Sequence, residues 1–377
     1  MEKIYLDYNA STPIAPEARE AMLPFLEQHY GNPSALHFEG IHAKQAVENA
    51  RKQVASLLQC EPNEVIFTSG GSESNNYVLK GVFTTFRNKG NHIITTTIEH
   101  PAIMNPCHFL ESLGAKITYV PVDQNGRVNP DDIKKAITDE TILITVMHSN
   151  NEVGTIQPIK EIGKIAKGHN ILFHTDASQS VGKIPIDVHD LQVDFLTVAG
   201  HKLYAPKGIG ALYMRAGVEI ESLIHGAGHE SGRRAGTENV VFAVGLGEAC
   251  SLAKRSMSRN EEIRDLRNYF WEQLQTTFNK KIAINGNLED SLPNTLNVSF
   301  VGQIGGDILA QVPDIAASTG SACHSGTVTL SPVLKAMGIT EHVGKGTIRF
   351  SLGRYTTKEE IDRAIYLLRE AVNICGI

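Results

Sequence analysis

One lysine in the sequence directly follows a segment that is typical of a buried strand. Val193 to Ala199 is mainly apolar, and Gly200, His201 and Lys202 follow it before a turn rich in glycine and proline. Ligands of open α/β folds bind where strands end, and an amine that is partly desolvated there can lose its proton and attack a carbonyl. A lysine in a glycine-rich turn is more often simply solvated, so the role of Lys202 depends on its surroundings.

Asp176 occupies an equivalent position, at the end of the strand pattern 171–176. A carboxylate at the end of a buried strand is unfavourable without a cationic partner, and a protonated pyridine nitrogen is such a partner. Gln179 follows three residues later, where its amide can donate to a phenolate oxygen on the same ring. The alternative is an aspartate that only starts a turn.

A glycine turn, Ser69-Gly70-Gly71-Ser72, precedes a helical pattern. Its amides and the helix dipole form a cradle for an anion such as phosphate, although such turns are common and the signal alone is weak. His201 can donate to the same phosphate. The combination of amine, carboxylate and phosphate cradle predicts pyridoxal 5′-phosphate (PLP) as the cofactor, with Lys202 as its Schiff-base lysine.

Two further strand patterns carry candidate residues. His100 follows the pattern 92–97, where an imidazole can lie over a pyridine ring and relay protons or, alternatively, bond the backbone. Arg349 lies within the apolar pattern 347–352. A half-buried guanidinium requires an anion, which can be the α-carboxylate of a substrate or a structural salt-bridge partner.

Cys323 lies in a segment of small and polar residues, 317–326. We expect a mobile, solvated loop in which His324 can lower the pKa of an accessible thiol; an incidental loop cysteine is the alternative. The other four cysteines are scattered without a Cys-x-x-Cys pair, so neither a disulfide framework nor a zinc knuckle is predicted. No metal site is predicted either, because His225 and His229 are separated by glycines and lack an acidic third ligand.

The composition is that of an ordinary globular protein. The 377 residues are enough for two domains, 41% of them are hydrophobic, and the net charge is −6. This charge gives no footprint for nucleic acid or an anionic membrane surface, and no apolar run is long enough to span a bilayer. Because the N-terminus also lacks the apolar core of a signal peptide, we expect a cytoplasmic protein.

Strand and helix patterns alternate through most of the chain, which predicts an α/β fold with a mostly parallel central sheet flanked by helices. Strands are expected at 64–68, 92–97, 116–121, 142–147, 171–176, 194–198 and 210–214, and helices at about 40–59, 101–113, 129–136, 158–167 and 240–254. Beyond residue 255 we expect a long amphipathic helix, strands at 296–300 and 347–351, and a last helix opened by a capping box at Thr357 and Glu360. The predicted domains are a large PLP-binding domain, 13–254, and a smaller α+β domain, 1–12 with 255–377, that carries the Cys323 loop.

Taken together, the motifs resemble one family: the PLP-dependent cysteine desulfurases of the iron–sulfur cluster assembly type, within the class V aminotransferases of fold type I. The resemblance covers essentially the whole chain, and its motifs are jointly highly specific. They are Tyr5-Leu-Asp-Tyr-Asn-Ala-Ser-Thr-Pro13, Gly31-Asn-Pro-Ser34, Phe67-Thr-Ser-Gly-Gly-Ser-Glu-Ser74, Asn150-Asn-Glu-Val-Gly154, Gly200-His-Lys202, Arg233-Arg-Ala-Gly-Thr-Glu-Asn239, Gly320-Ser-Ala-Cys323 and Ile348-Arg-Phe-Ser-Leu-Gly-Arg354.

The resemblance implies a role for each candidate residue. Lys202 is then the Schiff-base lysine, His100 stacks on the ring, Asp176 faces the pyridine nitrogen and Gln179 faces the phenolate oxygen. The phosphate is held by Gly71, Ser72 and His201, and by Thr237 from the other subunit of a homodimer. Asn151 and Arg349 hold the substrate carboxylate, with Asn151 also beside the cofactor, and Cys323 takes the sulfur.

The activity implied is conversion of L-cysteine to L-alanine, with the sulfur passing to Cys323 as a persulfide and then to an acceptor protein such as an iron–sulfur scaffold. Many family members have a serine where this chain has Ala199, so one hydrogen bond to the phosphate is absent here. Ala199 and the Cys-His-Ser run also resemble selenocysteine lyases, which makes selenocysteine lyase activity a rival function. A plain aminotransferase and a non-catalytic assembly scaffold are rival functions as well.

Overall fold

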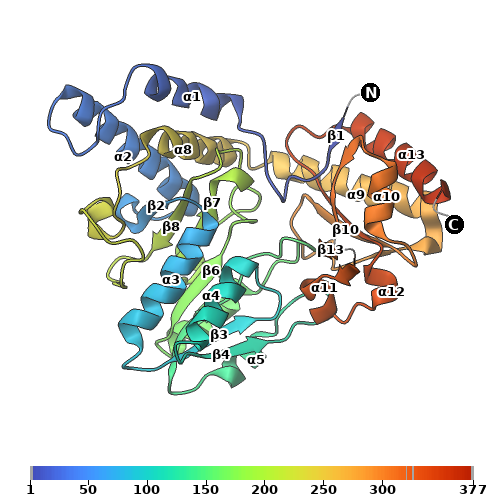
Figure 1. The fold of residues 1–377 in the computed structure, drawn as a ribbon, viewed down its shortest axis with the longest axis horizontal. Helices are drawn as coiled ribbons and strands as arrows, with labels where there is room; N and C mark the ends of the chain where they lie inside the picture. The colour runs from blue at the N-terminus through green and yellow to red at the C-terminus, as the bar shows by residue number, and fades with distance from the viewer. Residues whose placement is uncertain (1–2, 320, 325–326, 375–377) are drawn as a thin grey trace.

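The computed structural model describes residues 3–319, 321–324 and 327–374, and only the backbone of 321–324, 327–328 and 373–374. The chain forms two regions, each built on its own sheet (Figure 1). The middle of the chain forms the larger region, and both ends of the chain lie in the smaller one (Figure 1). In the part of the chain that is described, no helix is both long and apolar enough to cross a membrane.

A seven-stranded sheet forms the larger region. Its strands, in spatial order, are β2 (Val65–Thr68), β8 (Gly210–Met214), β7 (Phe195–Ala199), β6 (Leu172–Asp176), β5 (Thr141–Thr145), β3 (His92–Thr96) and β4 (Lys116–Val120). Neighbouring strands are parallel from β7 to β4, whereas β8 runs antiparallel to both of its neighbours. The prediction of an α/β fold with a mostly parallel sheet is confirmed.

Helices cover both faces of this sheet. One face packs against α3 (Gly71–Phe86) and α4 (Pro101–Glu111). The other face packs against α1 (Pro16–Glu27), α2 (Phe38–Leu58), α5 (Pro130–Ala136), α6 (Ile159–Gly168), α7 (Val188–Leu191) and α8 (Val240–Arg255). Consecutive strand residues such as Ile93 and Ile94 belong to opposite cores. A strand that is buried on both faces therefore requires the unbroken apolar runs that the sequence contains.

The smaller region has a four-stranded antiparallel sheet with the order β12 (Ser318–Thr319), β15 (Thr347–Ser351), β10 (Thr295–Phe300) and β9 (Ile282–Ile284). Its core includes α9 (Arg259–Phe278), α10 (Gly305–Gln311) and α13 (Lys358–Ile374). The predicted capping box opens α13, because Thr357 and Glu360 each bond the backbone amide of the other. The N-terminal strand β1 (Ile4–Tyr5) pairs in parallel with β11 (Ile315–Ala316), so the start of the chain joins its last third.

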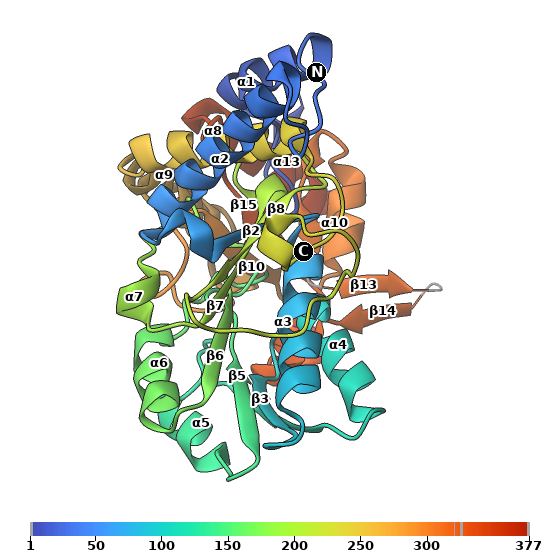
Figure 2. The same ribbon diagram turned by 90° about the vertical axis from the view of Figure 1, so that its left-hand side faces the viewer.

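The segment around Cys323 is a hairpin instead of the expected loop. Strands β13 (Ser321–His324) and β14 (Thr327–Leu330) are antiparallel, with Cys323 opposite Val328. Figure 2 shows this hairpin projecting from the body of the molecule. The β-branched residues of β14 favour a strand, and β13 pairs with this strand although its own small residues have low strand propensity. Two short helices follow, α11 (Pro332–Ala336) and α12 (Glu341–Gly344).

Candidate active site

A cavity of about 620 Å³ opens where β5, β6 and β7 end. This is the edge of a parallel sheet at which α/β folds bind ligands. The cavity is also lined by the N-terminal segment 9–11, by the glycine turn and by β15. It brings together every predicted site residue except Thr237 and Cys323: Gly71, Ser72, His100, Asn151, Asp176, Gln179, His201, Lys202 and Arg349.

Lys202 ends a short 3₁₀ turn that begins immediately after β7. Its Nζ donates to two backbone carbonyls of the N-terminal segment, Asn9 O at 2.6 Å and Ala10 O at 2.8 Å. Burial lowers the pKa of Lys202 to about 8, and Arg349 acts in the same direction while nearby carboxylates oppose the change. Roughly a tenth of such amines are neutral at pH 7, so Lys202 has access to the form that acts as a nucleophile or base.

Asp176 is only 7% exposed at the end of β6. Its Oδ2 accepts a hydrogen bond from Asn75 Nδ2 at 2.7 Å, and its Oδ1 accepts one from the Ser178 amide at 3.0 Å. Within the described residues it makes no ion pair. Asp176 is therefore a buried carboxylate whose hydrogen-bond donors are all neutral. Such a carboxylate suits a cationic ligand atom, for example a pyridinium nitrogen. Sequence analysis did not identify Asn75, which lies near the start of α3 and reaches Asp176 from that helix.

The glycine turn fits closely against the sheet. Gly70 has φ +144°, and a Cβ on Gly71 would lie 3.0 Å from Ser178 Oγ and 3.5 Å from the Cβ of Ala199. The amides of Gly71 and Ser72 open α3 and have no acceptor within the helix, so they can bind an anion. Ser178 also lines the cavity. Its hydroxyl and the methyl side chain of Ala199, which has no hydroxyl, both lie beside Gly71.

Two histidines of the cavity are neutral. Burial lowers the pKa of His201 to about 4, helped by the adjacent Lys202 and by Lys207, so this ring acts on an anion as a hydrogen-bond donor and not as a charge. His100 caps α4, and its Nδ1 accepts from the Ala102 amide at 3.1 Å. Burial also lowers the pKa of His100, and because Nδ1 accepts this bond, the ring N–H lies on Nε2. The backbone bond considered for His100 is therefore present, the ring also lines the cavity, and its place over a pyridine ring stays a prediction.

Lys183 fixes the amide of Gln179, and sequence reasoning did not identify it. Its Nζ donates to Gln179 Oε1 at 2.9 Å, while Gln179 Nε2 donates to Asn9 O at 2.9 Å. Burial lowers the pKa of Lys183 well below its ordinary range, with Lys202 and Arg349 acting in the same direction. Both residues lie in a turn, where a spacing of four residues gives no signal of contact.

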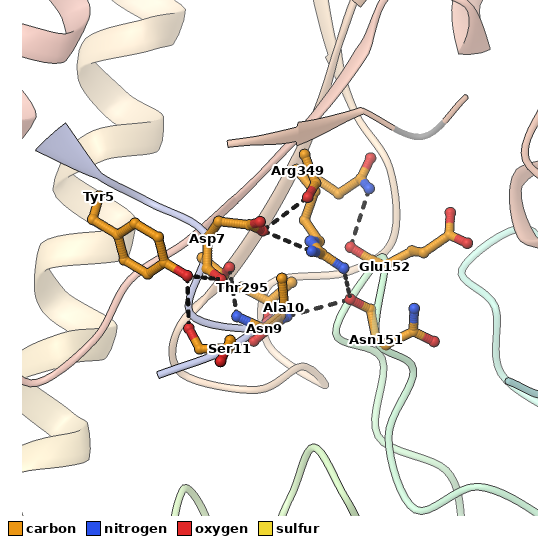
Figure 3. A network of polar contacts seen from close by, with 12 residues as sticks. Tyr5, Asp7, Asn9, Ala10, Ser11, Asn151, Glu152, Thr295 and Arg349 are labelled. Carbon is orange, nitrogen blue, oxygen red and sulfur yellow. Dashed lines mark hydrogen bonds and ion pairs between the residues drawn. The ribbon is translucent and has the colours of Figure 1, made fainter. Parts of the chain in front are cut away.

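Arg349 lies inside β15 and is 8% exposed. Figure 3 shows its guanidinium between Asp7 and Asn151. Its Nη2 donates to Asp7 Oδ1 at 2.7 Å and its Nη1 to the Asn151 carbonyl at 2.8 Å, while Nε is buried without a partner. The salt bridge considered from the sequence is therefore present, but it leaves N–H donors of a cavity-lining arginine unused.

Thr237 is exposed, and it is not among the residues that line this cavity. The segment that leads to it is anchored by a buried ion pair, in which Arg51 donates to both oxygens of Glu230 at 2.6 and 3.0 Å. Arg234 of the same segment pairs with Glu73 at 2.9 Å, beside the glycine turn. The thiol of Cys323 lies outside the described side chains, so its prediction stays a prediction.

These features fit PLP. A buried carboxylate suited to a pyridinium, free amides at a helix start, a neutral histidine donor and an amine of lowered pKa all line one cavity. The close approach of Gly71 to the sheet also leaves its amide accessible to a phosphate without an intervening side chain.

Comparisons with known proteins agree with this arrangement. The family model for aminotransferase class-V matches residues 4–364. The chain is 47% identical over 373 residues to "Cysteine desulfurase IscS" of Dictyoglomus turgidum, with 98% of this chain and 94% of the relative covered. It is 46% identical over 376 residues to the protein of the same name from Clostridium botulinum strain Hall, with the same coverage.

Two solved structures are also similar. A "NifS-like protein" superposes with a TM-score of 0.93 at 38% identity, covering 99% of this chain and 100% of that one. "SspA in complex with cysteine" superposes with a TM-score of 0.82 at 38% identity, covering 94% of this chain and 100% of that one.

Proposed function

The chain belongs to the aminotransferase class-V family, and from this premise we propose that it is a PLP-dependent cysteine desulfurase that converts L-cysteine to L-alanine. Its fold is that of the fold-type-I PLP transferases. The observation that carries the proposal is a single cavity that holds an amine of lowered pKa, a buried carboxylate without a cation and an arginine with spare donors: Lys202, Asp176 and Arg349.

The residues that would hold PLP follow from their chemistry. Asp176 would face the pyridine nitrogen, the amides of Gly71 and Ser72 with His201 would hold the phosphate, and Lys202 would be the point of covalent attachment. Gln179 would face the phenolate oxygen, with Asn151 and His100 beside the ring. When bound, PLP withdraws electrons from the α-carbon of a substrate amine.

The protein's own residues perform the remaining tasks. Arg349 and Asn151 bind the substrate carboxylate, and Lys202 Nζ moves a proton at the α-carbon, which its lowered pKa permits. His100 offers an Nε2 proton at the same cavity. The Cys323 thiolate attacks the substrate sulfur: an S–S bond forms, the C–S bond breaks, and its electron pair stays with the carbon that is then protonated to give alanine.

The persulfide on Cys323 would then pass to an acceptor protein, such as a scaffold on which iron–sulfur clusters are assembled. The location would be the cytoplasm, in keeping with free thiols at Cys60, Cys107 and Cys250, the cysteines whose side chains are described. The net charge of −6 speaks against nucleic acid as a partner.

The assembly would be a homodimer. Large apolar side chains are exposed along α1, α2 and their connection: Leu26, Tyr30, Leu36, Phe38 and Ile41. Tyr30 and Leu36 are 88% and 92% exposed, which a second copy of the chain would cover. Thr237, exposed and away from its own cavity, would reach the phosphate of that second copy. The domain division would be 13–254 against 1–12 with 255–377, because the two main sheets fall on either side of it.

Replacing Cys323 by alanine tests this function. Cys323→Ala should lower the formation of alanine and sulfide from cysteine at least about 100-fold, because the sulfur loses its acceptor, while PLP stays bound by its visible absorbance. Cys60→Ala is the matched control, since burial raises the pKa of that thiol to about 12 and makes it unreactive.

Parallel assays with selenocysteine and with a 2-oxo acid separate the rival functions. Equal rates for Cys323→Ala and wild type on cysteine would contradict the persulfide mechanism. Wild type active only on selenocysteine would be a selenocysteine lyase, and activity only with the 2-oxo acid would make it an aminotransferase. A PLP-bound protein inert toward all three would be a scaffold.

A further inference from the structure

The hairpin that carries Cys323 is held by a serine at each end. Ser318, in the strand that leads into it, donates from Oγ to Asp7 Oδ1 at 2.9 Å. Ser331, directly after β14, donates from Oγ to Glu152 Oε2 at 2.6 Å. Both serines have described side chains, and both bond a carboxylate. The two ends of the segment are therefore fixed by acidic residues.

One of these carboxylates bonds Arg349 directly, and the other belongs to the residue next to an Arg349 contact. Asp7 is its ion-pair partner, and Glu152 follows Asn151, whose carbonyl accepts from Arg349 Nη1 (Figure 3). Ser318 is also the direct antiparallel partner of Arg349 in the β12–β15 pairing. The Ser318 anchor of the Cys323 segment is thus joined to the arginine to which we assign the substrate carboxylate.

The two contacts of Asp7 share one atom. Oδ1 accepts from Arg349 Nη2 at 2.7 Å and from Ser318 Oγ at 2.9 Å. A substrate carboxylate can bind the unused N–H donors of Arg349, and it then shares the single positive charge of the guanidinium with Asp7. A weaker pairing of Asp7 with Arg349 would leave Oδ1 a stronger acceptor for Ser318. The contact between Glu152 and Ser331 is linked to Arg349 only through the charge of the guanidinium, since within the described residues no hydrogen bond joins Glu152's carboxylate to Arg349.

We propose that Asp7 is a positioning residue of the desulfurase reaction. It orients Arg349 before the substrate arrives and, through the same oxygen, transmits the binding of the substrate carboxylate to Ser318 at the base of the Cys323 hairpin. The thiol-bearing segment is therefore most firmly anchored when substrate is present. This inference rests on the proposed roles of Arg349 and Cys323. By reciprocity, a change at Ser318 must also alter the affinity of Arg349 for a carboxylate.

The test measures the reactivity of the thiol, and not turnover alone. Holoenzyme is treated with iodoacetamide, and alkylation of Cys323 is followed by mass spectrometry with and without saturating L-alanine. L-alanine has the carboxylate and amine of the substrate without its sulfur. In wild type, alanine should slow alkylation at least threefold, whereas L-alaninamide, which lacks the carboxylate, should not.

Three variants separate the link from general loosening of the hairpin. Ser318→Ala should abolish the effect of alanine and weaken alanine binding about threefold, because Asp7 Oδ1 is left to Arg349 alone. Asp7→Asn should also abolish the effect, since a neutral amide does not compete with a carboxylate. Ser331→Ala should retain it. In steady state, Ser318→Ala should lower kcat for cysteine about tenfold and change KM less than about threefold.

Two results would overturn the inference: persistence of the alanine effect in Ser318→Ala, or its loss in Ser331→Ala to the same degree. The first would mean that alanine shields the thiol directly, and the second that any weakened anchor has the same consequence. Failure of the proposed function is distinguishable, because wild type would then form no alanine from cysteine, or Cys323→Ala would keep full activity.

Discussion

The lowered pKa of Lys202 predicts that this lysine destabilises the apoenzyme. Lys202→Met keeps the length of the side chain and removes the charge. In the folded apoenzyme the pKa of Lys202 is about 8, against 10.5 for an ordinary lysine. At 1.36 kcal/mol per pH unit, this gap corresponds to about 3 kcal/mol of destabilisation at pH 7. The variant also loses the two hydrogen bonds to Asn9 and Ala10, each worth about 0.5–1.5 kcal/mol. The expected net gain is therefore about 0–2 kcal/mol.

The pH dependence carries the test. Between pH 8 and 10.5 the unfolded chain binds a proton at this lysine that the folded protein has released, so the stability of wild type rises with pH through this window. The free energy of unfolding of both apoproteins is measured by urea denaturation at pH 7 and pH 10. Lys202→Met should be the more stable at pH 7 and lose that advantage at pH 10. All other titrating groups are common to both proteins and cancel. A stability difference that is the same at the two pH values would refute the reasoning.

Three further predictions concern the carboxylate site, the phosphate site and the anchor of the Thr237 segment. Arg349→Ala should raise KM for cysteine at least about 30-fold, because a charge-assisted pair with the substrate carboxylate worth about 2–5 kcal/mol is lost. PLP affinity should stay within about threefold. Unchanged cysteine kinetics would leave Arg349 with a structural role only. Ser178→Ala should weaken PLP binding about tenfold in a titration of the apoenzyme, since its hydroxyl replaces the one missing at Ala199; equal affinity would show that it does not. Glu230→Gln should lower the free energy of unfolding by up to about 3–5 kcal/mol, because it leaves Arg51 charged with only the half-exposed Glu48 as an ion-pair partner, and a loss below about 1 kcal/mol in urea denaturation would contradict this.

The part of the site that lies at strand ends could be predicted from the sequence. Asp176 and Lys202 end neighbouring parallel strands, β6 and β7, and His100 follows β3 at the same edge, so their meeting is a consequence of the α/β pattern. Local pattern alone was sufficient here, because consecutive apolar runs identify the strands and the turns after them identify the edge.

The rest depends on contacts between distant segments. Asp7 meets Arg349 across 342 positions, and Asn9 meets Lys202 across 193, and no local pattern encodes either distance. The orientation of Gln179 by Lys183 also escaped prediction, because both residues lie in a turn whose spacing carries no periodic signal. The Cys323 hairpin escaped prediction because residues of low strand propensity are paired there by their neighbours in β14.

The pairing of β1 with β11 has a consequence for how the protein is made. The ribosome delivers β11 only about 300 residues after β1, which takes roughly 15–60 s at about 5–20 residues per second. Until then β1 has no strand to pair with, and the segment that presents Asn9 and Ala10 to Lys202 is held from its other side, where Thr12 bonds the carbonyl of His201. A nascent chain therefore contains Lys202 well before both anchors of this segment are in place.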